Sequence, residues 1–176
     1  MPDGSEAFGS RREPGIPDAV NWVKALLAAP PYPAGLVWQF ASWFGFDLFV
    51  DNIDRHINNF LYREHQGVIS LFGFDFSEAL LNPPWPPSQD LREPCRTVEV
   101  RRVLAAHGLG LDRNKAILML DRLAALDDEW MDVSLPAVPA PWLDAGERDS
   151  LSRWWRGGRL ARLAHIKQEV ANGRYP

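Results

Sequence analysis

A nearly unbroken apolar run, LVWQFASWFGFDLFV at residues 36–50, restricts the fold more than any other feature of this sequence. Apolar side chains surround almost the whole circumference of such a helix, and a helix of this kind belongs in the centre of a core. The run is too short to span a bilayer, and it is interrupted by Gln39 and Asp47. The sequence therefore predicts a buried helix around which the other elements pack.

Length and composition limit the class of protein. The 176 residues are enough for one domain with a substantial core and too few for two ordinary domains. A formal net charge of −4 gives no sign of a nucleic-acid or membrane-surface binder. Cys95 is the only cysteine, which excludes an internal disulfide and fits a reducing compartment. Because residues 1–20 are polar and carry no secretory pattern, we expect a cytoplasmic protein that does not enter the membrane.

The remaining chain combines helical patterns, two strand-like runs and proline-rich segments. Helices are predicted over residues 19–29, 36–50, 97–106, 112–126 and 147–172, the last with a break near residues 157–158. Two runs rich in β-branched and aromatic residues, 59–64 and 67–76, predict a β-hairpin. Irregular structure is predicted for residues 1–16, 81–94 and 134–143. The order of elements predicts one α+β domain, residues 1–176, that is mostly helical.

A polar cluster, FVDNIDRHINNF at residues 49–60, follows the apolar run. Within it, Asp54 and Asn59 are five residues apart, and Asp75 stands at the end of the second predicted strand. Phosphoryl transfer from ATP needs a carboxylate to orient or deprotonate the acceptor, and oxygen ligands for magnesium from two segments. The spacing is compatible with that chemistry. The alternative is a polar turn in which Asp51 and Asn52 cap helix ends.

The segment VDNIDRHINNFLYREHQGVISLFGFDFSEAL resembles the C-terminal lobe of HipA-like kinases. Their pattern is an N-x-D-R-H-x-x-N loop, a hairpin and a metal-binding aspartate. The loop matches residue by residue at Asn52, Asp54, Arg55, His56 and Asn59, and Asp75 matches the metal-binding position. The resemblance is carried mainly by residues 52–80, and it implies the C-terminal lobe of a kinase-like fold.

Roles for individual residues follow from this resemblance. It implies that Asp54 is the catalytic base or orients the acceptor hydroxyl, and that Asn59 and Asp75 bind Mg²⁺ beside ATP. It also implies that Arg55 and His56 support the catalytic loop, one through its charge and one through a hydrogen bond. For His56 the alternative is a structural histidine satisfied by a backbone carbonyl.

The sequence departs from the family in two ways. It contains no G-x-G-x-x-G phosphate loop, and its three lysines, Lys24, Lys115 and Lys167, all fall in helical patterns. The N-terminal lobe of the kinase is therefore expected to be absent from these 176 residues. In addition, Phe76 and Ser77 occupy the positions where the family has His-Gly after the metal-binding aspartate.

Three explanations fit these departures. The chain is a fragment of a longer kinase, one half of a split kinase whose N-lobe is a second polypeptide, or a degenerate module that kept the fold. The first two predict a phosphotransfer site that is inactive without an N-lobe, and they leave the phosphoacceptor unspecified. The third predicts a non-catalytic protein-interaction module. A basic stretch near the end of the chain is interpreted as a solvated helix face, with anion or partner binding as the alternative: Arg153, Arg156, Arg159 and Arg162.

Overall fold

The computed structural model of this protein describes residues 28, 32, 34–66, 68–79, 87 and 94–175. Three predictions fall wholly or mostly outside these residues: the helix over residues 19–29, the irregular segment 1–16 and the irregular segment 81–94. The description below concerns the remaining chain.

The described part of the chain is mostly helical and contains one antiparallel hairpin, so the predicted α+β class is confirmed. Its helices and strands are α2 (Ala34–Phe49), β1 (Phe60–His65), β2 (Val68–Gly73), α3 (Arg96–Ala106), α4 (Arg113–Ala124), α5 (Asp128–Ser134), α6 (Ala145–Gly157) and α7 (Arg159–Ala171). Short 3-10 turns are η1 (Ile57–Asn59), η2 (Leu135–Ala137) and η3 (Ala140–Trp142). Helix α5 was not predicted, and β2 ends three residues before the predicted limit at Phe76.

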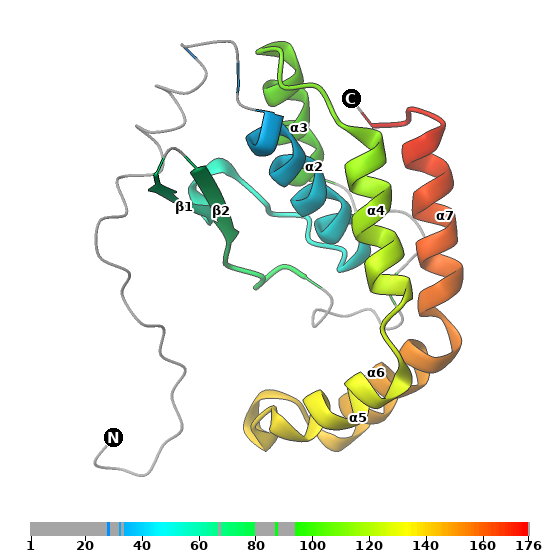
Figure 1. Ribbon diagram of the computed structural model, residues 1–176. Helices are drawn as coiled ribbons and strands as arrows, with labels where there is room; N and C mark the ends of the chain where they lie inside the picture. The colour runs from blue at the N-terminus through cyan, green and yellow to red at the C-terminus, as the bar shows by residue number, and fades with distance from the viewer. Residues whose placement is uncertain are drawn as a thin grey trace, which may run out of the picture.

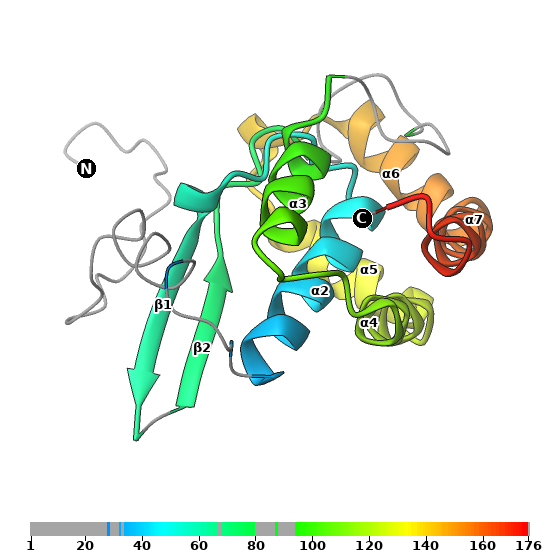
Figure 2. The same cartoon turned by 90° about the horizontal axis from the view of Figure 1, so that it is seen from above.

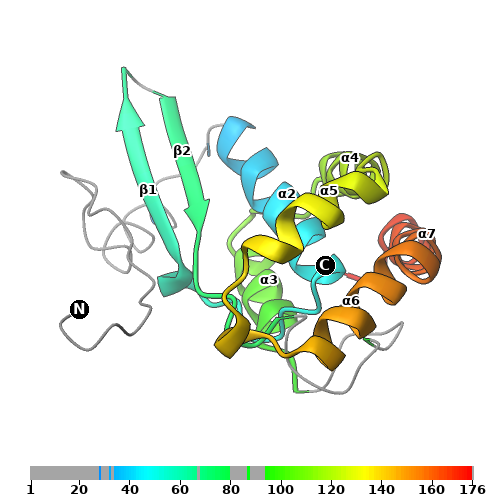
Figure 3. The same cartoon turned by 90° about the horizontal axis from the view of Figure 1, so that it is seen from below.

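Helix α2 lies at the centre of the arrangement, as its apolar circumference predicts (Figure 1). Figure 2 shows the hairpin on one side of α2 and helices α4 and α7 on the other. Helices α5 and α6 lie at the lower end of this helical layer, and Figure 3 shows them from below. No helix within the described ranges is long and apolar enough to cross a membrane.

The contact between α2 and α4 depends on Gly45. A Cβ atom added at Gly45 would lie 2.7 Å from the backbone oxygen of Ala116, closer than real Cβ contacts come. The two helices therefore approach each other backbone to backbone, and only glycine fits at this point of the crossing. Ala116 is fully buried there and belongs to the main apolar cluster of the protein.

Helix α2 also holds the hairpin, through hydrogen bonds from two half-buried side chains, Gln39 and Trp43. The Gln39 amide donates to the Ile69 carbonyl at 2.7 Å and accepts from the Leu71 N–H at 2.6 Å. The indole N–H of Trp43 donates to the Leu71 carbonyl at 3.3 Å. These three bonds satisfy backbone groups of β2 that do not pair with β1, so the hairpin cannot slide along α2 without losing them.

Candidate functional site

The polar cluster begins where α2 ends. Asp51 has a left-handed backbone conformation, with φ of 53°, and the N–H of Asn52 donates back to the carbonyl of Asp47 at 2.9 Å. This is the geometry of a Schellman-type helix end, in which glycine or a short polar residue takes the left-handed position. Asp51 thus fills the capping role considered in the alternative interpretation of the cluster.

A second segment of the chain supports the same helix end. Arg162 of α7 donates to the carbonyls of Leu48 and Phe49 at 2.8 and 2.9 Å, and its guanidinium lies 3.6 Å from the Asp51 carboxylate. Both Arg162 and Arg159 are buried, so the interpretation of the basic stretch as a solvated face is wrong for these two residues. An arginine near the carboxyl end of a helix satisfies carbonyls that have no partner within that helix.

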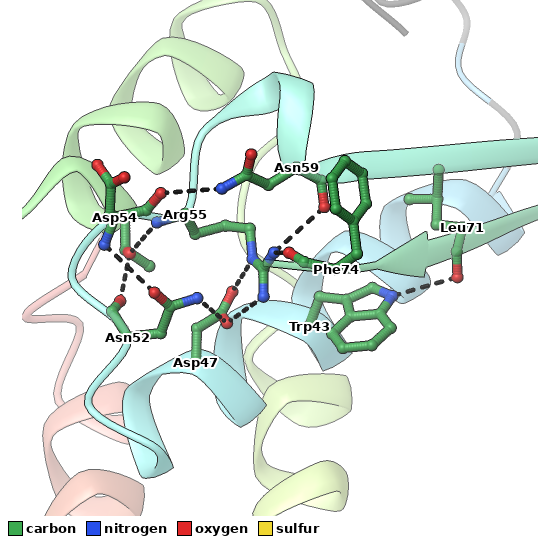
Figure 4. Close-up of polar contacts among 9 residues, drawn as sticks. Trp43, Asp47, Asn52, Asp54, Arg55, Asn59, Leu71 and Phe74 are labelled. Atoms are coloured by element: carbon green, nitrogen blue, oxygen red, sulfur yellow. Dashed lines mark hydrogen bonds and ion pairs between the residues drawn. The ribbon is translucent and has the colours of Figure 1, made fainter. Parts of the chain in front are cut away.

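Arg55 is the centre of a buried network (Figure 4). Its Nε and Nη2 atoms donate to the two carboxylate oxygens of Asp47, each at 2.9 Å, and both side chains are almost completely shielded from solvent. Its Nη1 atom donates to the carbonyl of Asn59 at 3.2 Å and to the carbonyl of Phe74. Arg55 therefore joins α2, the loop that carries Asp54, and the segment after β2. This is compatible with the role of loop support that the family resemblance implies for Arg55.

Aromatic rings surround the guanidinium of Arg55. Its Cζ atom lies 4.6 Å from the ring centroid of Phe76, 5.3 Å from that of Phe60 and 5.9 Å from that of Trp43. A cation over aromatic faces is stabilised by their quadrupoles, and more so when water is excluded. The charge of Arg55 is thus compensated by one carboxylate, two carbonyls and several rings.

The sequence marks Asp47 only as an interruption of the apolar run, and its pairing with Arg55 was not predicted. Burial raises the pKa of Asp47, while the bonds from Arg55 and from the Asn52 amide, the latter 2.9 Å long, act in the opposite direction. A charged side chain in an otherwise apolar helix is costly unless it is paired, so Asp47 itself was the signal that a buried cation lies nearby. Arg55 is that cation.

Thr97, at the start of α3, fixes the other side of the loop. Its hydroxyl accepts from the N–H of Arg55 at 3.0 Å and donates to the carbonyl of Asn52, and its own N–H donates to the carbonyl of Ile53 at 3.3 Å. Thr97 is buried. Nothing in the local sequence indicates this contact, because it joins residues more than forty positions apart.

Asp54 and Asn59 are joined directly. The Asn59 amide nitrogen donates to the backbone carbonyl of Asp54 at 3.3 Å, and the N–H of Asp54 donates to the side-chain oxygen of Asn52 at 3.3 Å. With its nitrogen used in this way, Asn59 has its amide oxygen as the atom to offer a metal. The Asp54 carboxylate is partly exposed and accepts from Arg96 at 3.1 Å.

Asp75 follows β2 in a left-handed conformation, with φ of 57°. Its carboxylate accepts from the hydroxyl of Ser77 at 2.8 Å and from the N–H of Ser77 at 3.3 Å, and these bonds lower the pKa of Asp75. The charges of His56 and Arg55 lower it further, so both lie within electrostatic reach of this carboxylate. Aspartate tolerates the left-handed region, and here its side chain closes a local turn onto Ser77.

A backbone hydrogen bond connects the loop that carries Asp54 and Asn59 with the segment that carries Asp75. The N–H of Phe74 donates to the carbonyl of Asn59 at 3.0 Å, so the residue before Asp75 lies against the end of the loop that carries Asp54. His56 precedes the η1 turn without capping it through its side chain. An ionised carboxylate and an amide oxygen suit Mg²⁺, a hard cation that binds oxygen.

The described residues contain no group of three or more His, Cys, Asp or Glu side chains placed to hold a metal ion. A site built from Asn59 and Asp75 with water or phosphate oxygens would not form such a group. Comparison with known proteins gives no family for this chain. No family model matches it, and neither a curated protein nor a solved structure matches it.

Proposed function

We propose that this chain is the C-terminal lobe of a HipA-like kinase, with Asp54, Asn59 and Asp75 forming its phosphotransfer site. The observation that supports this most is the backbone bond between Phe74 and Asn59. It brings a loop of the form D-x-x-x-x-N and a second aspartate, from a separate segment, to one end of a hairpin. Phosphoryl transfer requires that combination of an acceptor-orienting carboxylate and metal-binding oxygens.

Each residue has a role in this proposal. The Asp54 carboxylate orients the acceptor hydroxyl or takes its proton. Asn59 and Asp75 would hold Mg²⁺ through their side-chain oxygens, and Asp75 is ionised at neutral pH, as an aspartate ordinarily is. When bound, Mg²⁺ would neutralise charge on the phosphates of ATP. Arg55 fixes the distance between the loop and the segment of Asp75 through its bonds to the carbonyls of Asn59 and Phe74.

An apolar cavity lies next to this site. It has a volume of about 430 Å³ and is lined by Gln39, Ser42, Trp43, Phe46, Leu71, Phe76, Met119 and Leu123. Phe76, one of its lining residues, directly follows the proposed metal ligand Asp75 in the chain. Nucleotide sites are typically apolar hollows with a few polar groups at one end, and this arrangement supports a place for a base or for a covering lobe.

A non-catalytic interaction module is the rival function, and the outer face of the hairpin favours it. Phe72 and Phe74, with 45% and 40% of their surfaces exposed, alternate with inward-facing residues along this segment, and Val68 is 65% exposed on the same face. Exposed apolar side chains gathered on one face are typical of a surface that binds another protein. In the kinase proposal the same face would contact the N-lobe.

The 176 residues alone are expected to transfer phosphate poorly. The sequence contains no G-x-G-x-x-G loop to hold the phosphates, and the two lysines within the described ranges, Lys115 and Lys167, lie on helices. Losing one electrostatic stabiliser of the transition state costs roughly 2.7–4 kcal/mol, and losing several costs more, although such losses do not simply add. We therefore expect activity only when an N-lobe is supplied, in cis or as a second chain.

The test measures metal binding first and transfer second. Mn²⁺, which replaces Mg²⁺ and broadens nearby NMR signals, should affect Asn59 and Asp75 in the wild-type chain, and Asp75→Asn should weaken its binding. Radiolabelled ATP then reports transfer by the chain with and without an N-lobe. Asp54→Asn and Asp75→Asn should abolish the transfer that the N-lobe restores.

The matched control is Asp121→Asn, which removes an exposed carboxylate on α4 far from the loop in sequence. It should change neither Mn²⁺ broadening nor transfer. Robust transfer that survives Asp75→Asn would show that the site is elsewhere. If Mn²⁺ does not bind and an N-lobe restores nothing, the interaction module is the better explanation.

A further inference from the structure

A second cavity lies where α2 and α4 end against α5 and α6, and Phe46 and Leu123 line both this cavity and the one beside Phe76. Its volume is about 300 Å³, and every residue that lines it is hydrophobic: Phe46, Phe49, Val50, Leu123, Leu126, Trp130, Met131, Leu151, Trp154 and Trp155. The hollow is partly open to solvent, because Trp130 at its rim is 45% exposed. Concave, mostly apolar hollows of this size are typical of small-molecule sites.

The walls of the cavity are held rigid by contacts among its own aromatic rings. Phe49 stacks on Trp154 with centroids 5.7 Å apart, and Trp130 stacks on Trp155 with centroids 5.0 Å apart. The indole N–H of Trp155 donates to the carbonyl of Asp127 at 3.3 Å. The cavity is therefore largely preformed, and a ligand would not have to order it on binding.

The charged side chain beside the cavity is already paired with protein groups. The guanidinium of Arg159 lies 4.5 Å from the ring centroid of Trp155, but it donates to Asp128 at 2.6 Å, to the carbonyl of Trp155 at 3.2 Å and to the carbonyl of Leu126. Its charge is thus already compensated by a carboxylate. A carboxylate or phosphate group entering the cavity would lose its hydration against a wholly apolar lining.

We infer that this cavity binds a neutral aromatic small molecule of two or three rings. The volume is at the lower limit of small-molecule sites, which is too little for a peptide helix. Five of the ten lining side chains are aromatic, so a ring in the cavity can make edge-to-face or offset contacts with them, and the thioether of Met131, buried in the wall, also makes favourable contacts with rings. Trp130, 45% exposed, forms the rim and would be covered by the ligand. The inference does not depend on the proposed kinase function.

The experiment uses N-phenyl-1-naphthylamine, a neutral aromatic probe whose fluorescence rises in apolar surroundings, with the full chain. We expect saturable binding, quenching of tryptophan emission and a rise in Tm. Val50→Phe and Leu126→Phe each place a ring in the cavity, and each should weaken binding by about tenfold or more because the added volume leaves no room for the probe. Circular dichroism establishes which variants are folded, and either one suffices.

Two controls locate the binding. Leu160→Phe adds a ring at an exposed position of α7 that does not line the cavity, and it should bind as the wild type does. Ser42→Leu narrows the other cavity, beside Phe76, and should also bind normally. Naphthalene should displace the probe, whereas laurate should not. Absence of binding, binding unchanged in a folded Val50→Phe or Leu126→Phe variant, loss of binding in Ser42→Leu, or displacement by laurate as strong as by naphthalene would each overturn the inference.

Discussion

Asp47 and Arg55 form a bidentate ion pair that is buried on all sides, and it joins the middle of the structure to the loop that carries Asp54. The pair lies eight residues apart in sequence, with the end of α2 between its members. Because Arg55 also holds the carbonyls of Asn59 and Phe74, the ion pair determines where both halves of the candidate site lie.

The first prediction concerns the removal of one member of this pair. Arg55→Leu should lower the free energy of unfolding by roughly 3–5 kcal/mol, because it leaves the Asp47 carboxylate buried and unpaired. Arg96→Leu is the matched control: it breaks the exposed pair with Asp54 and should cost about 0–1 kcal/mol. Urea denaturation measures both. The double variant Asp47→Leu/Arg55→Leu should be more stable than Arg55→Leu, and equal or lower stability would contradict this account.

The second prediction concerns the backbone at Asp75. Asp75→Val should lower the free energy of unfolding by roughly 1–2 kcal/mol, since a β-branched residue resists the left-handed conformation. Asp75→Asn should leave stability nearly unchanged, because asparagine tolerates this region. The comparison separates backbone strain from lost metal binding. Equal stabilities for the two variants would indicate that the segment relaxes to another conformation.

The third prediction concerns the titration of Asp75. Ser77→Ala removes the hydroxyl that lowers the pKa of Asp75, so this pKa should rise towards its ordinary value. A carboxyl group with a lowered pKa in the folded state stabilises the fold above its unfolded pKa, and this contribution is lost as the pH falls through the folded pKa. The part of the free energy of unfolding that is lost on acidification through Asp75 should therefore be smaller in Ser77→Ala. Carboxyl ¹³C shifts followed against pH measure the change, and an unaltered midpoint would contradict it.

The fourth prediction concerns the crossing of α2 and α4. Gly45→Ala should lower the free energy of unfolding by about 1–3 kcal/mol, because its Cβ would meet the backbone oxygen of Ala116 and push the helices apart. Gly35→Ala is the control in the same helix, with nothing within 4 Å of its added Cβ. It should raise the free energy of unfolding by about 0.4–1 kcal/mol. Thermal unfolding of both variants tests the contrast, and destabilisation by Gly35→Ala would be inconsistent with it.

The elements could be predicted from sequence where a periodic apolar pattern exists. The central position of α2 followed from its apolar circumference, and the hairpin from two β-rich runs. Helix α5 was missed because it is only seven residues long and mostly exposed, so no apolar stripe marks it. The second strand was extended too far, since its apolar character continues past the point where the backbone of Asp75 turns.

The candidate site was predictable only in part, because its supports are distant in sequence. The residues of the polar loop could be identified by their spacing. The hydrogen bonds between Thr97 and this loop could not, because they join segments that no local pattern relates. Arg159 and Arg162 have the spacing of a solvated face, but Arg162 turns inward to the end of α2 and Arg159 to α5 and the carbonyls near it. Burial of an arginine depends on carbonyls and carboxylates elsewhere in the fold, which the sequence of one helix does not reveal.

The bonds from Gln39 and Trp43 to β2 also determine how this sheet can grow. A sheet edge with unpaired backbone groups invites strands from other molecules, and proteins commonly cover such edges. Along Ile69 and Leu71 the covering groups are side chains of α2, so a foreign strand cannot add there without displacing both of them. Any strand exchange or fibril-like pairing through this hairpin is thereby directed to the β1 side, and truncation of Gln39 to alanine would open a second route to self-association.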